Sequence, residues 1–266
     1  MRIARVFPSK TSMCPQDKDS YFGLPDFFTP QYDEIHISVT FTWDIQKAYV
    51  LKGSWNSYGK VIMGGVAISG ESNKPMVSGM YLKKGITITS RGCNNNCSFC
   101  MVRNGLIELD TFPEGNIIQD NNILACSDKH RRKVWSMLSK QQGIEFNGGL
   151  EKSRITPKIA KELRSLSIKT LWLACDQPNA TKSLAKAVHN LTKVGFTRSH
   201  LYCYALCGKD MQEEEERMKE IWKIGCMPFA QLYKNKDDSM NYSRQWKQFA
   251  RRWSRPAIIR SRMKQP

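Results

Sequence analysis

From residue 81 the chain alternates short apolar stretches with amphipathic ones, the pattern of strands and helices in an α/β domain. The expected strands are Ile86–Ser90, Asn116–Gln119, Ile144–Asn147, Thr170–Cys175, Leu201–Leu206 and Pro228–Tyr233. The expected helices span residues 127–140, 156–166, 180–194 and 211–224. This alternation predicts a parallel sheet with its functional site at the carboxyl ends of the strands. About 150 residues are too few for eight units, so a partial (β/α)6 barrel is expected over 81–235.

Residues 1–80 show a weaker version of the same pattern. Ile35–Phe41 and residues 60–65 are apolar enough for strands, and residues 44–54 between them supply a crossover helix. Four prolines predict that the first thirty residues are mostly loop. We therefore expect a small Rossmann-like cap over 1–80, in which His36, flanked by isoleucines, is a core or interface histidine.

Residues 236–266 form a strongly basic segment on a chain of net charge +17, and there is no acidic residue from 239 onwards. Trp246, Phe249 and Trp253 fall at helical spacing with arginines between them. One interpretation is a helix that packs its aromatic side chains on the barrel and leaves its arginines in solvent. The other is a nucleic-acid contact, with arginines on phosphates and an aromatic ring free to stack.

The chain contains no apolar run of about eighteen residues, and its N-terminus has no secretory pattern. We therefore expect a cytoplasmic protein without a membrane partner, whose nine cysteines stay reduced. Six of them stand apart and are interpreted as small buried hydrophobes: Cys14, Cys126, Cys175, Cys203, Cys207 and Cys226. Cys203 and Cys207 share a strand face, which leaves a second metal site as the less favoured alternative. The acidic run at 213–216 is interpreted as a solvated helix start rather than a metal site.

The other three cysteines, Cys93, Cys97 and Cys100, crowd into one loop. Alternating isoleucine and threonine predict a strand just before them, and Arg91-Gly92 ends it. Three thiolates at these gaps can bind one corner of a 4Fe–4S cluster, and without a fourth nearby cysteine one iron would stay open for a chelating ligand. Zinc with His130, disulfides and a pure electron-transfer cluster are the weaker alternatives.

This Cys-x3-Cys-x2-Cys spacing, together with the preceding strand, the following βα units and Phe99 before the last cysteine, resembles the radical S-adenosylmethionine (SAM) superfamily. The chain is most similar to small phage or bacterial members with a reduced cobalamin-binding-type N-terminal region. The resemblance implies a 4Fe–4S cluster on Cys93, Cys97 and Cys100, and Phe99 near the SAM adenine. It also implies reductive cleavage of SAM to a 5′-deoxyadenosyl radical, with electrons from a flavodoxin or ferredoxin. The cobalamin motif Asp-x-His-x-x-Gly is absent, so no cobalamin is predicted.

Further cofactor-binding residues are expected where later strands end. The resemblance suggests Asp120 or Asn121 for the SAM ammonium, and Asp176 as a polar residue facing the cofactor. Arg154 is a candidate for the SAM carboxylate and Glu151 for the ribose hydroxyls. An asparagine-rich turn and a surface ion pair are the structural alternatives. No catalytic acid or base can be assigned.

Three functions remain open at this stage. The first is a radical SAM enzyme that abstracts hydrogen from a nucleic acid, and the second is one that acts on a peptide or small metabolite. The third is a non-catalytic iron–sulfur binding module.

Overall fold

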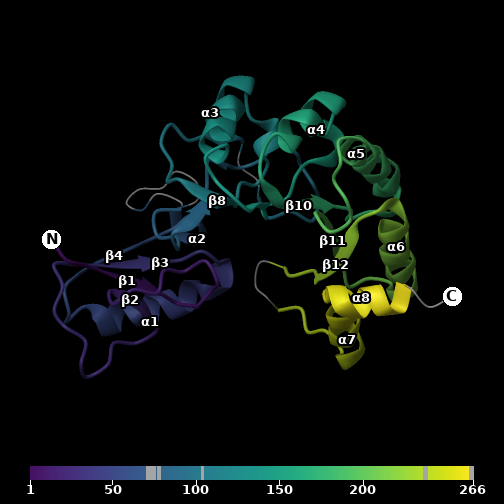
Figure 1. The fold of residues 1–266 in the computed structure, drawn as a ribbon. Coiled ribbons are helices and arrows are strands. Elements are labelled where there is room, and N and C mark those ends of the chain that lie inside the picture. Colours follow the sequence, from purple (N-terminus) through teal and green to yellow (C-terminus); the bar gives the residue numbers. More distant parts are fainter. Residues whose placement is uncertain (70–75, 77–78, 103–104, 236–238, 264–266) are drawn as a thin grey trace. The chain divides into compact units, whose positions relative to one another are not determined.

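The computed structural model describes the whole chain except residues 70–75, 77–78, 103–104, 236–238 and 264–266. The chain divides into two compact units (Figure 1). The smaller unit spans Met1–Ile88. The larger spans Thr89–Asn235 and continues from Ser239 to the C-terminal end.

The smaller unit is built on a parallel sheet of four strands in the order β2-β1-β3-β4. The strands are β1 (Ile3–Phe7), β2 (Ser20–Phe22), β3 (Glu34–Ser38) and β4 (Lys60–Gly64), and the helices are η1 (Thr42–Asp44), α1 (Ile45–Trp55) and α2 (Val66–Ser69). The two expected strands and the helix between them are confirmed. The first thirty residues are mostly loop, as expected, but they also contain β2 and β1, an interior strand that buries Ala4 and Val6. His36 is a buried, satisfied histidine, since its ring contacts Glu34 and the Tyr81 hydroxyl.

The structure contains the six-stranded parallel sheet that the sequence predicts, and five of its strands, β8 to β12, lie in the larger unit. Its order, β12-β11-β10-β9-β8-β5, follows the chain without a reversal. The strands are β5 (Gly85–Thr87), β8 (Gly115–Ile118), β9 (Ile144–Phe146), β10 (Ile168–Ala174), β11 (Leu201–Cys207) and β12 (Met227–Leu232). A two-stranded antiparallel ribbon, β6 (Ser90–Arg91) with β7 (Ile107–Glu108), follows β5.

Four helices alternate with these strands and lie along the same outer side of the sheet (Figure 1). They are α3 (Asp128–Leu138), α4 (Pro157–Arg164), α5 (Thr181–Lys193) and α6 (Met211–Ile224), with short turns η3 (Ile123–Ala125), η4 (Lys152–Arg154) and η5 (Pro178–Ala180). Side-chain caps start three of them: Ser127 for α3, Thr156 for α4 and Asp210 for α6. The buried faces of these helices and the alternate strand residues that are buried with them form one apolar core.

Helix α6 begins in the acidic run, as expected, but the run is not simply solvated. The Glu214 carboxylate is buried and accepts hydrogen bonds from the backbone N–H groups of Gly208 and Lys209. Glu215 accepts from the Trp253 ring N–H at 2.5 Å and from Arg262 at 2.8 Å. The run therefore fastens neighbouring segments to α6.

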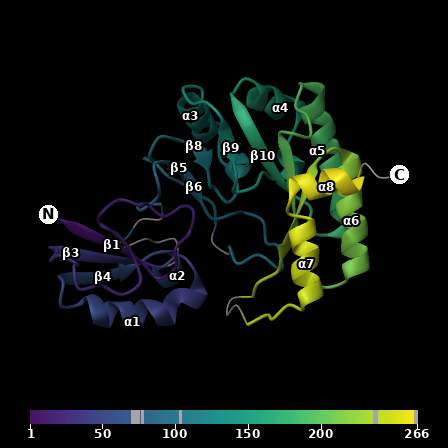
Figure 2. The same cartoon turned by 60° about the horizontal axis from the view of Figure 1, so that its bottom comes forward.

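Helices α7 (Arg244–Arg252) and α8 (Pro256–Met263) lie beside α6 (Figure 2). Phe249 and Trp253 are 0% and 1% exposed, so the packing interpretation of this segment is confirmed. Neither of these two rings is free to stack on a base. Lys264, counted among the basic residues of the sequence, lies outside the described residues.

The six scattered cysteines are all buried, at 6% exposure or less, which confirms their interpretation as small hydrophobes. Burial raises the pKa of the Cys126 and Cys175 thiols to about 11 and that of Cys207 to about 12. In the part of the chain that the structure describes, no helix has the length and apolar character needed to cross a membrane.

Candidate active site

The loop that carries Cys93, Cys97 and Cys100 follows β5 and β6 at the carboxyl end of the sheet. Gly92 opens it with φ 72°, a left-handed conformation that favours glycine. All three cysteines are reduced; Cys97 is exposed and the other two are half-buried. The backbone N–H of Asn95 donates to Cys93 Sγ at 3.4 Å, and that of Val102 donates to Cys100 Sγ at 3.4 Å.

Three consecutive residues after β8 hold the entry to this loop. The buried Asp120 carboxylate accepts from Thr89 N at 2.6 Å, Thr89 Oγ1 at 2.5 Å and Ser90 Oγ at 2.7 Å. Asn121 Oδ1 accepts from the Gly92 N–H at 3.1 Å. Asn122 Nδ2 donates to Cys93 Sγ at 3.3 Å. We call residues 120–122 the loop anchor, because in chain order they contact successive residues of the segment from Thr89 to Cys93.

Asn122 is the centre of a polar network beside Cys93. Its Nδ2 also donates to Glu151 Oε2 at 2.7 Å and lies 3.5 Å from Asn94 Oδ1, so both amide hydrogens are engaged. Its Oδ1 is buried and has no hydrogen-bond partner within the described part of the chain, in a side chain only 2% exposed. A buried acceptor without a donor is costly, so this atom marks a place where a ligand N–H or O–H would be stabilised.

Glu151 completes the network with Arg154, whose Nε pairs with it at 2.8 Å, and with Ser153 Oγ at 2.7 Å. Partial burial favours the neutral acid. Donation from Asn122, Ser153 and Arg154 outweighs burial and holds the pKa of Glu151 below its usual value. An ionised carboxylate and its arginine therefore lie one side chain away from Cys93.

Asp120 lies deeper, and burial raises the pKa of its carboxyl, although the hydrogen bonds from Thr89 and Ser90 act the other way. His130, the zinc-ligand alternative, is also buried, with Nε2 3.3 Å from Thr89 Oγ1. Both side chains therefore serve the strand end behind the loop.

The three loop thiols lie within electrostatic range of one another. Partial burial raises the pKa of the Cys97 thiol, and Cys100, Cys93 and Asp176 raise it further, while Lys152 lowers it. Among the described residues, no three cysteine, histidine or carboxylate side chains converge as a metal site. The donor set nevertheless suits a thiophilic cluster, since three reduced cysteines share one loop, and backbone and amide N–H groups already point at two of the sulfurs.

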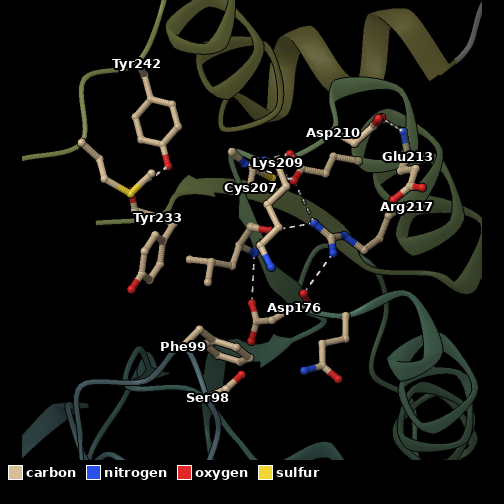
Figure 3. A pocket seen from close by; sticks show the side chains of 15 residues that line it. Ser98, Phe99, Asp176, Cys207, Lys209, Asp210, Glu213, Arg217, Tyr233 and Tyr242 are labelled. Carbon is tan, nitrogen blue, oxygen red and sulfur yellow. Dashed lines mark hydrogen bonds and ion pairs between the residues drawn. The ribbon is translucent and has the colours of Figure 1, made fainter. Parts of the chain in front are cut away.

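A cavity of about 480 Å³ opens on the other side of the loop. Ser98 and Phe99 line it at one end next to Asp176, and Tyr233 and Tyr242 line one side (Figure 3). A cavity of this size is in the range that holds cofactors and small ligands. It brings Phe99, from the cysteine loop, together with the carboxyl ends of β10, β11 and β12.

Asp176 follows β10, and its Oδ1 accepts from the Leu206 N–H at 3.0 Å. Burial raises the pKa of this carboxyl, although the Leu206 N–H, Lys152 and Arg217 favour its ionised form. Arg217 binds two strand-end carbonyls, Asp176 O at 3.0 Å and Leu206 O at 2.6 Å. A buried arginine thereby fixes the adjacent ends of β10 and β11 under the cavity.

The predicted site residues therefore fall into two groups around one loop. Asn121, Glu151 and Arg154 gather on the side of Cys93, while Phe99 and Asp176 share the cavity. Asp120 belongs to neither, because Thr89 and Ser90 occupy its carboxylate.

Asn122 and Arg217 were missed as site residues. The sequence contains a signal for Asn122, because it is the last of three consecutive polar residues that follow a predicted strand. It contains none for Arg217, which lies within a charged helix.

Comparison with known proteins adds nothing to this picture: no family model matches the chain, and no curated protein is significantly similar to it.

Proposed function

We propose that this chain is a radical SAM enzyme in which Cys93, Cys97 and Cys100 hold a 4Fe–4S cluster. The observation that carries the proposal is the cysteine loop itself. Three reduced cysteines follow the first strand of a six-stranded parallel sheet, N–H donors point at two of their sulfurs, and Phe99 lines an adjoining cavity.

The strand order supports a partial (β/α)6 barrel as the finer description of the larger unit. A doubly wound sheet reverses its strand order at the ligand site. Here the order follows the sequence, and α3 to α6 lie on one side, as in a barrel wall. A wall of this kind would collect the residues that follow six strands around one centre.

Bound together, the cluster and SAM would supply a 5′-deoxyadenosyl radical able to abstract hydrogen from an unactivated carbon. The chain's own contribution is to bind and orient. The unpartnered Oδ1 of Asn122 and the ionised Glu151 suit the SAM ammonium and hydroxyl groups. We no longer assign the ammonium to Asp120, because three donors already occupy its carboxylate.

On the cavity side, Phe99 offers an aromatic face, and Asp176 is held by the Leu206 N–H so that it can receive a hydrogen bond from a ligand. An enzyme of this kind works in the cytoplasm, where its thiols stay reduced and a flavodoxin or ferredoxin supplies electrons.

The test is anaerobic reconstitution of the full chain with iron and sulfide. Wild type is expected to bind four irons per chain, to show the paramagnetic signal of a reduced 4Fe–4S cluster, and to release 5′-deoxyadenosine from SAM with dithionite. Cys97→Ala is expected to lose all three. Cys14→Ala is the matched control, because it removes one buried thiol from the smaller unit.

Each other outcome has a defined meaning. A stable cluster without 5′-deoxyadenosine would favour the non-catalytic iron–sulfur module. Tight zinc binding in place of iron, or a Cys97→Ala variant with full iron content, would reject the proposal.

A further inference from the structure

Helix α7 presents a row of cations on its outer face. Arg244, Lys247 and Arg251 are exposed and recur at helical spacing, three and four residues apart. Side chains at this spacing are neighbours, with Cβ atoms about 5–6 Å apart. The opposite face is fixed to the core by buried aromatic side chains, so the row is held in a defined place. We call these three residues the α7 cation row.

Helix α7 itself carries no acidic residue to balance this row. The chain has no acidic residue after Asp238, and none of the three cations has an ion-pair partner in the part of the chain that the structure describes. Three further exposed arginines follow at Arg252, Arg255 and Arg260. Like charges this close repel one another, so a polyanion that lies along α7 gains attraction and also relieves that repulsion.

The row leads to the cavity of the candidate active site. Tyr242, which lines that cavity, is followed by Ser243, the N-cap of α7. A groove lined by Gln245, Gln248 and Arg251 also reaches Met211, two residues from Lys209 on the cavity wall. Gln245 and Gln248 add neutral hydrogen-bonding groups beside the cations.

The cavity itself has the opposite character. Its lining holds four carboxylates against two cations, so acidic groups prevail and disfavour a phosphate inside it. The acids are Asp176, Asp210, Glu213 and Glu214, and the cations are Lys209 and Arg217. Tyr233 and Tyr242 provide aromatic surface along one side, apart from Phe99, which the proposed function assigns to SAM. A neutral, flat group with N–H donors fits this lining, and a nucleobase is such a group.

We propose that the α7 cation row binds the phosphate backbone of a single-stranded nucleic acid and that one of its bases enters the cavity. A base inside a duplex cannot reach such a cavity, which is why an unpaired strand is the fitting form. The assignment of nucleic acid as substrate rests on the proposed function, whereas the binding surface does not. An acidic protein would match the cation row but has no comparable group for the cavity.

The first test measures binding of a fluorescent single-stranded oligonucleotide of about 15 nucleotides, long enough for one binding site, by anisotropy. The variant is Arg244→Gln with Arg251→Gln, and the matched control is Lys158→Gln with Lys161→Gln, two exposed lysines on α4. Each phosphate contact to a single strand contributes about 0.7 to the slope of log affinity against log salt. The α7 variant should therefore lose about 1.4 from that slope, and the α4 control should match wild type.

The second test addresses the cavity. Tyr233→Leu should weaken binding by about 5- to 150-fold, the effect of losing one base–aromatic stack, without changing the salt slope. Poly-glutamate is the competing polyanion and should bind more weakly, with no response to Tyr233→Leu.

Three results would overturn the proposal: no oligonucleotide binding by wild type, equal losses in the α7 and α4 variants, or poly-glutamate binding as tight as that of the oligonucleotide. These assays need neither cluster nor SAM. Their failure would leave 5′-deoxyadenosine release unaffected, and failure of that release would leave them unaffected.

Discussion

The polar network beside Cys93 makes a sharp prediction for Asn122→Asp. This substitution keeps the shape of the side chain and replaces its amide N–H donors with a carboxyl group. Asn122 Nδ2 now donates to Glu151 Oε2 at 2.7 Å. Two carboxylates at that distance cannot both be ionised, so the folded variant must keep one proton between them.

The free energy needed to keep that proton bound at pH 7 sets the size of the destabilisation. An ordinary aspartate has a pKa about three units below neutral pH, and each unit is worth about 1.36 kcal/mol. Keeping a proton on the pair at pH 7 therefore costs about 4 kcal/mol of unfolding free energy. The folded pKa of the new group is raised, so the lost stability returns as the pH falls. The loss should shrink by about 1.36 kcal/mol per pH unit and disappear near about pH 4.

Urea unfolding followed by tryptophan fluorescence between pH 4 and pH 7 would measure this. Asn121→Asp is the matched control, because Asn121 uses only its Oδ1, as an acceptor from Gly92 N–H, and a carboxylate accepts equally well. It should cost less than about 1 kcal/mol at any pH. A pH-independent loss in Asn122→Asp, or an equal loss in the control, would refute the assigned donor and acceptor roles.

Three further substitutions, the first of them with a control, follow from contacts in the structure. Gly148→Ala would place Cβ 2.0 Å from the Asp120 carbonyl oxygen and should destabilise the fold by at least about 2 kcal/mol. The control Gly53→Ala adds its Cβ to open space in α1 and should stabilise the fold by about 0.5–1 kcal/mol. Urea unfolding measures both. Asp120→Ala removes three hydrogen bonds and should cost about 3 kcal/mol or more; a smaller loss would mean that the loop anchor is not needed. Glu215→Ala frees Trp253 Nε1 and Arg262, so limited proteolysis should cut the C-terminal helices sooner than in wild type, and unchanged cleavage would contradict their attachment to α6.

Much of the larger unit could be predicted because its strands are apolar runs bounded by clear helix signals. Apolar residues predominate in β10 and β11, where buried and half-buried positions alternate, and Thr156-Pro157 starts α4 as such pairs do. Strand β1 was not predicted from the sequence, because it has only five residues, one of them an arginine, and lies close to prolines. Its place between β2 and β3 depends on partners distant in sequence.

The site was less predictable, because polar residues that are adjacent in sequence contact different parts of the cysteine loop. Asp120, Asn121 and Asn122 are adjacent in sequence, yet only the turn after β8 decides which one faces Thr89, Gly92 or Cys93. Asn122 adopts φ −161° and ψ 70°, a conformation that composition alone does not reveal. An ion pair between Glu151 and Arg154 is one of the two interpretations that the sequence allows, and the structure contains it.

The loop anchor has a consequence for how the protein would be handled. Most of its bonds fasten backbone and hydroxyl groups of the segment before Cys93, so they do not depend on anything held by the sulfurs. Stripping metal with a chelator should then leave the circular dichroism spectrum and the melting temperature nearly unchanged, unlike in small zinc domains that unfold without metal. The cysteine loop would therefore keep its folded conformation before a cluster binds. Because Cys97 is exposed, its thiol would be the first of the three to be oxidised in a preparation that is not protected from air.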